Sequence, residues 1–115
     1  MTQTTVRQIE ESIQNAKQHI ELDKALERLE SNKDFKLVIS EGYLEKESIR
    51  LVHLKADPAM QTAERQASVV TQIDAIGGLL QYFRTVSQTA ALAAKSIDSD
   101  EETLAELAAE EINHG

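Results

Sequence analysis

The feature that most constrains this chain is an apolar pattern with alternating spacings of four and three residues in its second half. Its members are Val69, Ile73, Ile76, Leu80, Phe83, Ser87, Ala90, Ala94 and Ile97. Apolar residues at such spacings lie along one side of a helix. The pattern therefore predicts a helix over about 62–97 that packs along its length. With a rise of about 1.5 Å per residue, this helix is roughly 50 Å long, so it protrudes from a compact domain or breaks.

A second apolar stripe predicts a helix over about 4–31. Its first members are Val6, Ile9, Ile13, Ala16 and Ile20, and the stripe then shifts to Leu22, Leu26 and Leu29. Such a change of phase means that the helix bends, rotates or meets a different partner. The polar residues "SNKD" at 31–34 compete for backbone hydrogen bonds and end this helix.

The segment 34–56 is ambiguous at its start. A strand-like alternation comprises Phe35, Leu37 and Ile39, whereas a helical face comprises Phe35, Val38 and Ile39. We favour a helical connector, because the chain has no second strand-like run with which a strand would pair. Gly42 is expected to interrupt this helix, and Asp57-Pro58 is expected to end it. Apolar residues on more than one face predict that the connector is sandwiched between the longer helices.

The pair Gly77-Gly78 lies inside the strongest helical pattern, where the two glycines weaken the helix by roughly 2 kcal/mol relative to alanine. One interpretation is that a partner helix approaches the bare backbone closely. The other is a hinge or break that folds the helix back on itself. Because the apolar alternation continues across the pair, close approach is the favoured interpretation.

The residues from 98 onward form a separate acidic unit. Its acidic residues are Asp98, Asp100, Glu101, Glu102, Glu106, Glu110 and Glu111. Ser99 and Glu102 have capping-box spacing, which predicts that a fresh helix starts there. The sequence thus predicts an all-α fold, an antiparallel helical hairpin or small bundle with one long helix and a short acidic C-terminal helix. We expect a helical domain over 1–97, with helices about 4–31, 34–56 and 62–97, followed by the acidic helix or tail 98–115.

Composition argues against several classes of function. The chain has 12 basic and 20 acidic residues and a net charge of −8, which disfavours direct binding to nucleic acid. Without cysteine there is no thiolate site, and His19, His53 and His114 are too far apart in sequence for a known metal motif. No phosphate-binding loop is present, and no pair of carboxylates lies in an apolar setting suited to acid-base catalysis. We therefore expect no enzyme activity and no cofactor.

The N-terminus "MTQTTVRQIEES" lacks the apolar stretch of a signal peptide, and no apolar run is long enough to cross a bilayer. The expectation is therefore a soluble protein without a membrane partner.

Two stretches carry a resemblance to a known group of proteins. They are "DFKLVISEGYLEKESIRLVHLKADPAMQ" (34–61) and "IDAIGGLLQYFRTV" (73–86). Together they resemble short, acidic, all-helical proteins of tailed bacteriophages. The resemblance implies a virion or head-assembly context, in the virion or the host cytoplasm, and it transfers no site residue.

From the helical stripes, the composition and this resemblance, we expect a non-enzymatic structural or assembly protein. It would act through helix-helix contacts with copies of itself or with a larger virion component. The alternative is a small acidic phage protein that binds and regulates a host protein. The residues expected to make the contacts are Val69, Ile73, Ile76, Gly77, Gly78, Leu80 and Phe83. The acidic tail is the second candidate surface, because its attraction to a basic partner would be electrostatic.

Overall fold

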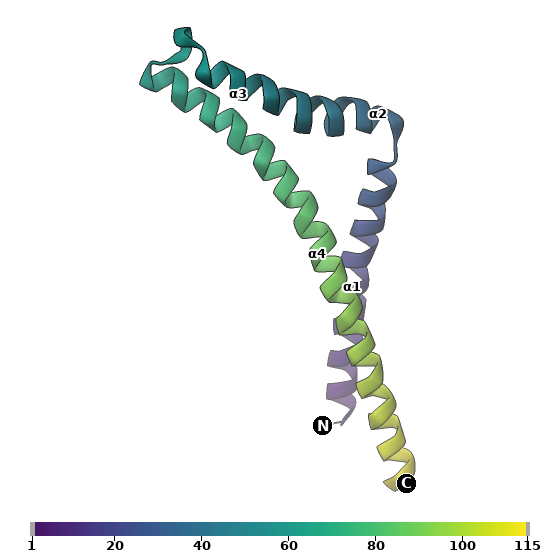
Figure 1. Cartoon of the computed structure of the whole chain (residues 1–115). Coiled ribbons are helices and arrows are strands. Elements are labelled where there is room, and N and C mark those ends of the chain that lie inside the picture. The colour runs from purple at the N-terminus through teal and green to yellow at the C-terminus, as the bar shows by residue number, and fades with distance from the viewer. Residues whose placement is uncertain (1, 115) are drawn as a thin grey trace. The chain divides into compact units, whose positions relative to one another are not determined.

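The computed structural model describes residues 2–114, and these are almost entirely helical (Figure 1). The elements in chain order are α1 (Thr2–Glu30), α2 (Lys33–Phe35), the π-helix η1 (Lys36–Glu47), α3 (Ser48–Ala56), the 3₁₀ turn η2 (Pro58–Met60) and α4 (Ala63–His114). No strand occurs among the described residues, so the all-α prediction is confirmed. The chain divides into two compact units. The central unit is Leu26–Thr85, and the terminal unit combines Met1–Ala25 with Val86–Gly115.

The core of the central unit lies where α3 packs on the first part of α4. Leu51 of α3 is fully buried together with Val69 of α4, and Ile76 of α4 completes this cluster. Partly buried apolar side chains surround it: Tyr43, Leu44, Leu54, Met60 and Ile73. Burial of apolar surface is the main stabilising contribution in such a core, so this cluster holds α3 on α4.

The connection between α3 and α4 is fixed by side chains that bond to the backbone. Asp57 adopts an extended conformation before Pro58, and its carboxylate accepts a hydrogen bond from Ala59 N at 2.8 Å. The side-chain amide of Gln66 donates to the carbonyl oxygens of Lys55 and Met60, each at 2.8 Å. The predicted stop at Asp57-Pro58 is confirmed, and these bonds hold the turn that brings α4 back along α3.

The connector 34–56 is helical, as expected, but its first half is a π-helix that the sequence did not predict. Gly42 lies inside η1 and does not interrupt it. Phe35 and Ile39 are partly buried, and the ring centroid of Phe35 lies 6.1 Å from that of Phe83 on α4. A π-helix closes i→i+5 hydrogen bonds, so its apolar positions recur at a longer spacing than in an α-helix. The π register thus turns Phe35 and Ile39 inward.

The opposite side of η1 remains uncovered within the described residues. Leu37 and Val38 are 61% and 62% exposed. The expectation that the connector is sandwiched between longer helices is therefore wrong for this part of the chain. The segment has apolar residues on two faces, and the π register turns Phe35 and Ile39 inward and leaves Leu37 and Val38 exposed.

The long helix α4 does not end near residue 97, and no fresh helix starts at Ser99. The helix continues without interruption to His114, so the prediction of a separate C-terminal helix is wrong. Ser99 lies within α4, where its carbonyl accepts a hydrogen bond from Thr103 Oγ1. Leu104 and Leu107 continue the partly buried face of the helix. Packing of this face is a stronger determinant than a capping sequence, which contributes only about 1 kcal/mol.

The buried face of α4 also changes phase along the helix, in contrast to the single alternation predicted. Ser87 and Ala94 are exposed, whereas their neighbours Val86 and Ala93 are buried. The buried and partly buried positions on this face are Val69, Ile73, Ile76, Leu79, Phe83, Val86, Ala90, Ala93, Ile97, Asp100, Leu104 and Leu107, and Gln66 and Thr89 are also partly buried. Ile73, Ile76 and Leu79 follow one another at two successive spacings of three residues, and Gly77 and Gly78 lie between the last two. Both steps lie within the central unit, where α4 packs on α3, and from Leu79 onward the alternation is regular again into the terminal unit.

In the terminal unit, α1 contributes one regular buried stripe. Ile13 and Ala16 are buried, and the stripe continues through Ile20 to Asp23. Asp23 accepts a hydrogen bond from Ser87 Oγ of α4 at 2.9 Å. The stripe was predicted to shift to Leu22, Leu26 and Leu29; Leu26 is buried as predicted, whereas Leu22 and Leu29 are 46% and 47% exposed, so the shift is wrong for these two residues. Asp23 can occupy this position of the stripe although it is polar, because the hydroxyl group of Ser87 on α4 donates a hydrogen bond to it.

Gly77 and Gly78 are exposed and helical. A Cβ atom added to either would meet no other atom within 4 Å, so no described part of the chain approaches them closely. The helix is also unbroken there. Neither interpretation of the glycine pair is therefore realised within the chain, and close approach by another molecule stays a prediction.

Replacing Gly77 or Gly78 with alanine should raise the free energy of unfolding by about 1 kcal/mol for each substitution. The gain comes from helix propensity, and the new methyl groups would contact nothing. Urea unfolding followed by circular dichroism checks this at several protein concentrations. A loss of stability at low protein concentration, where the chain is monomeric, would contradict it, whereas a loss that appears only at higher concentration would show that a second molecule packs on the glycines.

Candidate functional site

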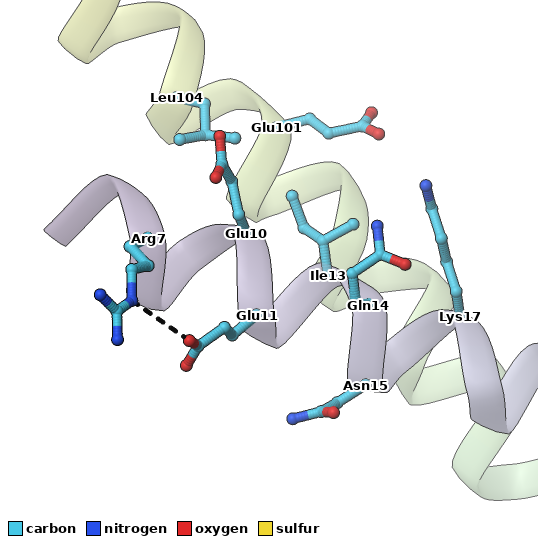
Figure 2. Close-up of a pocket in the computed structure, with 9 residues that line it drawn as sticks. All are labelled: Arg7, Glu10, Glu11, Ile13, Gln14, Asn15, Lys17, Glu101 and Leu104. Atoms are coloured by element: carbon cyan, nitrogen blue, oxygen red, sulfur yellow. Dashed lines mark ion pairs between the residues drawn. The ribbon is translucent and has the colours of Figure 1, made fainter. Parts of the chain in front are cut away.

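A hollow lies along the contact between α1 and α4 in the terminal unit (Figure 2). Its volume is about 580 Å³, and it is open to solvent. The residues that line it are Arg7, Glu10, Glu11, Ile13, Gln14, Asn15, Lys17, Glu101 and Leu104. A second hollow of about 270 Å³ adjoins it, lined by Val6, Glu10, Leu104, Leu107, Ala108 and Glu111. Since both share Glu10 and Leu104, they form one continuous surface, which we call the acidic groove.

The floor of the groove is apolar because it follows the seam between the two helices. Ile13 of α1 is buried, and Leu104 and Leu107 of α4 are partly buried. Glu10 precedes Ile13 by three residues on α1, and Glu101 precedes Leu104 by three residues on α4. This spacing places each carboxylate beside an apolar floor residue on its own helix. Figure 2 shows the side chain of Glu10 next to that of Leu104, which comes from the other helix.

Carboxylates dominate the rim of the groove. Glu10, Glu101 and Glu111 belong to it, with Lys17 as a basic residue at one end. Arg7 forms an exposed ion pair with Glu11, whose Nε–Oε1 distance is 3.5 Å. Such exposed pairs contribute little to stability and exchange readily for other partners. The groove therefore offers an acidic rim around an apolar floor.

The structure divides the predicted acidic tail into three groups. Glu101 and Glu111 line the groove, whereas Asp98, Glu102, Glu106 and Glu110 are exposed elsewhere on α4. Asp100 lies on the partly buried face, and its Oδ2 atom has no hydrogen-bond partner among the described residues. All of them belong to the last turns of one long helix. Of these residues, Glu111 lies in the last turn of α4, where negative charge opposes the helix dipole and a basic partner would relieve an unfavourable arrangement.

Most of the apolar residues predicted to contact another protein are instead packed inside the central unit. Val69 and Ile76 are buried against Leu51, and Ile73 and Phe83 are partly buried. The members that remain exposed are Gly77, Gly78 and Leu80. Contacts between this surface and another protein stay a prediction, now reduced to these three positions.

The described residues offer no group of three side chains suited to a metal ion. His19 and His53 are each exposed on a different helix, and the side chain of His114 lies outside the described part of the structure. Residues 2–114 also contain no helix with the length and hydropathy that crossing a membrane requires.

Glu47, a carboxyl group with a lowered pKa, lies at the junction of η1 and α3. Hydrogen bonds from Arg50 Nε, at 3.1 and 3.0 Å to the two carboxylate oxygens, hold the pKa of Glu47 below its ordinary value. The same contact raises the pKa of Arg50. The carboxylate of Glu47 therefore stays charged to a lower pH than an isolated glutamate, and it forms an ion pair with Arg50.

Sequence reasoning identified Glu101 and Glu111 but missed Glu10, Ile13, Leu104 and Leu107 as parts of one surface. The missing signal was the continuation of the α4 seam beyond Ile97, which the spacing of Leu104 and Leu107 carries. Comparisons with protein families, with curated proteins and with solved structures find no match.

Proposed function

We propose that this chain is a non-enzymatic interaction protein that acts through helix-helix contacts, with the acidic groove as its docking surface. The observation that carries the proposal is the groove itself, in which Leu104 and Leu107 form an apolar floor beside Glu10, Glu101 and Glu111. An amphipathic helix docks by laying its apolar face into a groove of this kind. The acidic rim selects a helix whose polar face carries lysine and arginine.

The resemblance to short acidic phage proteins supports a structural or assembly role, in which the partner helix belongs to a virion component. The same surface also suits the alternative, a regulator that binds a basic helix of a host protein. A whole-chain antiparallel hairpin or bundle that self-associates through Gly77, Gly78 and Leu80 is a further part of this proposal. Light scattering across micromolar concentrations tests self-association, and a constant monomeric mass would exclude it.

Binding to the groove should depend on particular carboxylates. We expect a lysine-rich amphipathic helical peptide to bind the full chain, and Glu101→Lys with Glu111→Lys to weaken its binding several-fold for each charge, since one exposed ion pair contributes up to about 1 kcal/mol. Fluorescence anisotropy of the labelled peptide measures the dissociation constant. Binding should also weaken between 0.1 and 1 M salt, as the screening length falls from about 10 to 3 Å.

The matched control is Glu102→Lys with Glu110→Lys, which changes the same charge on the same helix outside the groove. If both pairs weaken binding equally, the peptide responds to the general acidic field and the groove is not its site. An isosteric test of the floor is Leu104→Asn, which should weaken binding while leaving the net charge unchanged.

A pull-down from phage-infected cells separates the two biological roles. The tagged chain is recovered from particle-bound and soluble fractions, and its partners are identified by mass spectrometry. Recovery with capsid, portal or tail proteins supports the assembly role. Recovery with one soluble host protein supports the regulator.

A further inference from the structure

The π-helix Lys36–Glu47 and Phe35, the residue before it, carry two apolar faces that belong to two different helical registers. In the π register of this structure, Phe35, Ile39 and Leu44 lie on the partly buried side, at spacings of four and five residues. In an α-helix the same segment would present another set. Leu37, Leu44 and Leu51 are seven residues apart, and residues at that spacing share one face of an α-helix. The α register would therefore bring Leu37 into line with the fully buried Leu51.

Packing favours the π register in this structure. It brings three large side chains inward, namely Phe35, Ile39 and Tyr43, where the α register would bring in Leu37. The Phe35 ring gains a tilted contact with Phe83, a geometry that aromatic pairs favour. Leu37 remains 61% exposed as a result.

Gly42 is a position in η1 where a side chain would disturb the π register. A Cβ atom at this position would lie 2.9 Å from the carbonyl oxygen of Leu37, five residues earlier, which is too close for a carbon and a backbone oxygen. Alanine at 42 would thus collide with the backbone in the π register. In an α-helix, by contrast, alanine is favoured over glycine.

We propose that Lys36–Glu47 is a two-register segment, π in this state and α in an alternative state that exchanges Phe35 and Ile39 for Leu37 on the buried side. Gly42 sets the balance between the two. The exchange changes which apolar side chains this part of the protein shows to a partner, since Leu37 leaves the surface as Phe35 and Ile39 reach it. This device is independent of the acidic groove, which lies in the terminal unit.

The absence of cysteine from the chain allows a direct test by thiol labelling. Leu37→Cys and Ile39→Cys are made separately in the full chain, each with and without Gly42→Ala. With Gly42 present, the thiol at position 37 should react fast and the thiol at 39 slowly. With Gly42→Ala, the order should invert, and labelling at position 37 should slow by about tenfold or more, the change that 1.4 kcal/mol produces.

Three further measurements make every outcome informative. Gly77→Ala is the control, because it adds a methyl group in open space on another helix and should leave both labelling rates unchanged. Phe35→Ala weakens the packing that favours the π register, and it should also slow labelling at position 37. If Gly42→Ala leaves both rates unchanged, or if circular dichroism shows that it unfolds the chain instead of shifting its register, the proposal is overturned.

Discussion

Replacing Leu51 with alanine should lower the free energy of unfolding by about 2–5 kcal/mol, the range for truncating a buried leucine. Leu51 is 1% exposed and packs against Val69 and Ile76, which join α3 to the first part of α4. The loss combines the transfer of the removed methyl groups with the cavity that they leave. For a chain whose total stability is on the order of 5–15 kcal/mol, this is a large share.

The neighbouring residue provides the control for this measurement. Val52 of α3 is 59% exposed, so Val52→Ala should change stability by less than about 0.5 kcal/mol. Guanidinium unfolding of both variants, followed by circular dichroism, compares them directly. A loss for Val52→Ala as large as that for Leu51→Ala would contradict the observed orientation of α3 on α4.

The sequence predicted the helices well where their signals are local. The stripe from Val6 to Ile20 and the stop at Asp57-Pro58 depend on residues close together in the chain, and α1 and α3 follow them. The capping spacing of Ser99 and Glu102 is also local, yet it misled. Its contribution is smaller than that of the seam positions Leu104 and Leu107, which continue α4 along α1.

The phase of the α4 seam required knowledge of its partners. Leu79 and Leu80 are equally apolar, so the sequence leaves open which of them faces inward. Extending one alternation from Ile76 selected Ser87, although the adjacent Val86 is the buried residue. The α3 and α1 surfaces determine this choice, and they come from distant parts of the chain.

The π register of η1 and the acidic groove could not be predicted from the sequence for a similar reason. An i→i+5 helix has no propensity signature of its own, and Gly42 fits an interruption as well as it fits a π turn. The groove needs Glu10 and Leu104 side by side, two residues that only the packing of α1 on α4 brings together. The acidic residues of α4 were identified because charge can be counted without knowing the fold.

Small residues fill the seam of the terminal unit. Ala16 of α1 and Ala90 and Ala93 of α4 are all buried. A buried alanine at a helix contact leaves no space for a longer side chain unless the helices separate. The predicted seam placed Ala94 here, whereas the observed seam has Ala93, and this difference of one residue can be measured.

Enlarging Ala93 to leucine should destabilise the protein by about 1–3 kcal/mol, the usual result of overpacking a close contact. Ala94→Leu should change stability by less than about 0.5 kcal/mol, because Ala94 is exposed. Alanine and leucine have similar helix propensities, so the comparison isolates packing. Thermal unfolding of the two variants decides between the phases. If Ala94→Leu is the more damaging substitution, α4 keeps one alternation through its whole length and does not change phase between Ile76 and Leu79.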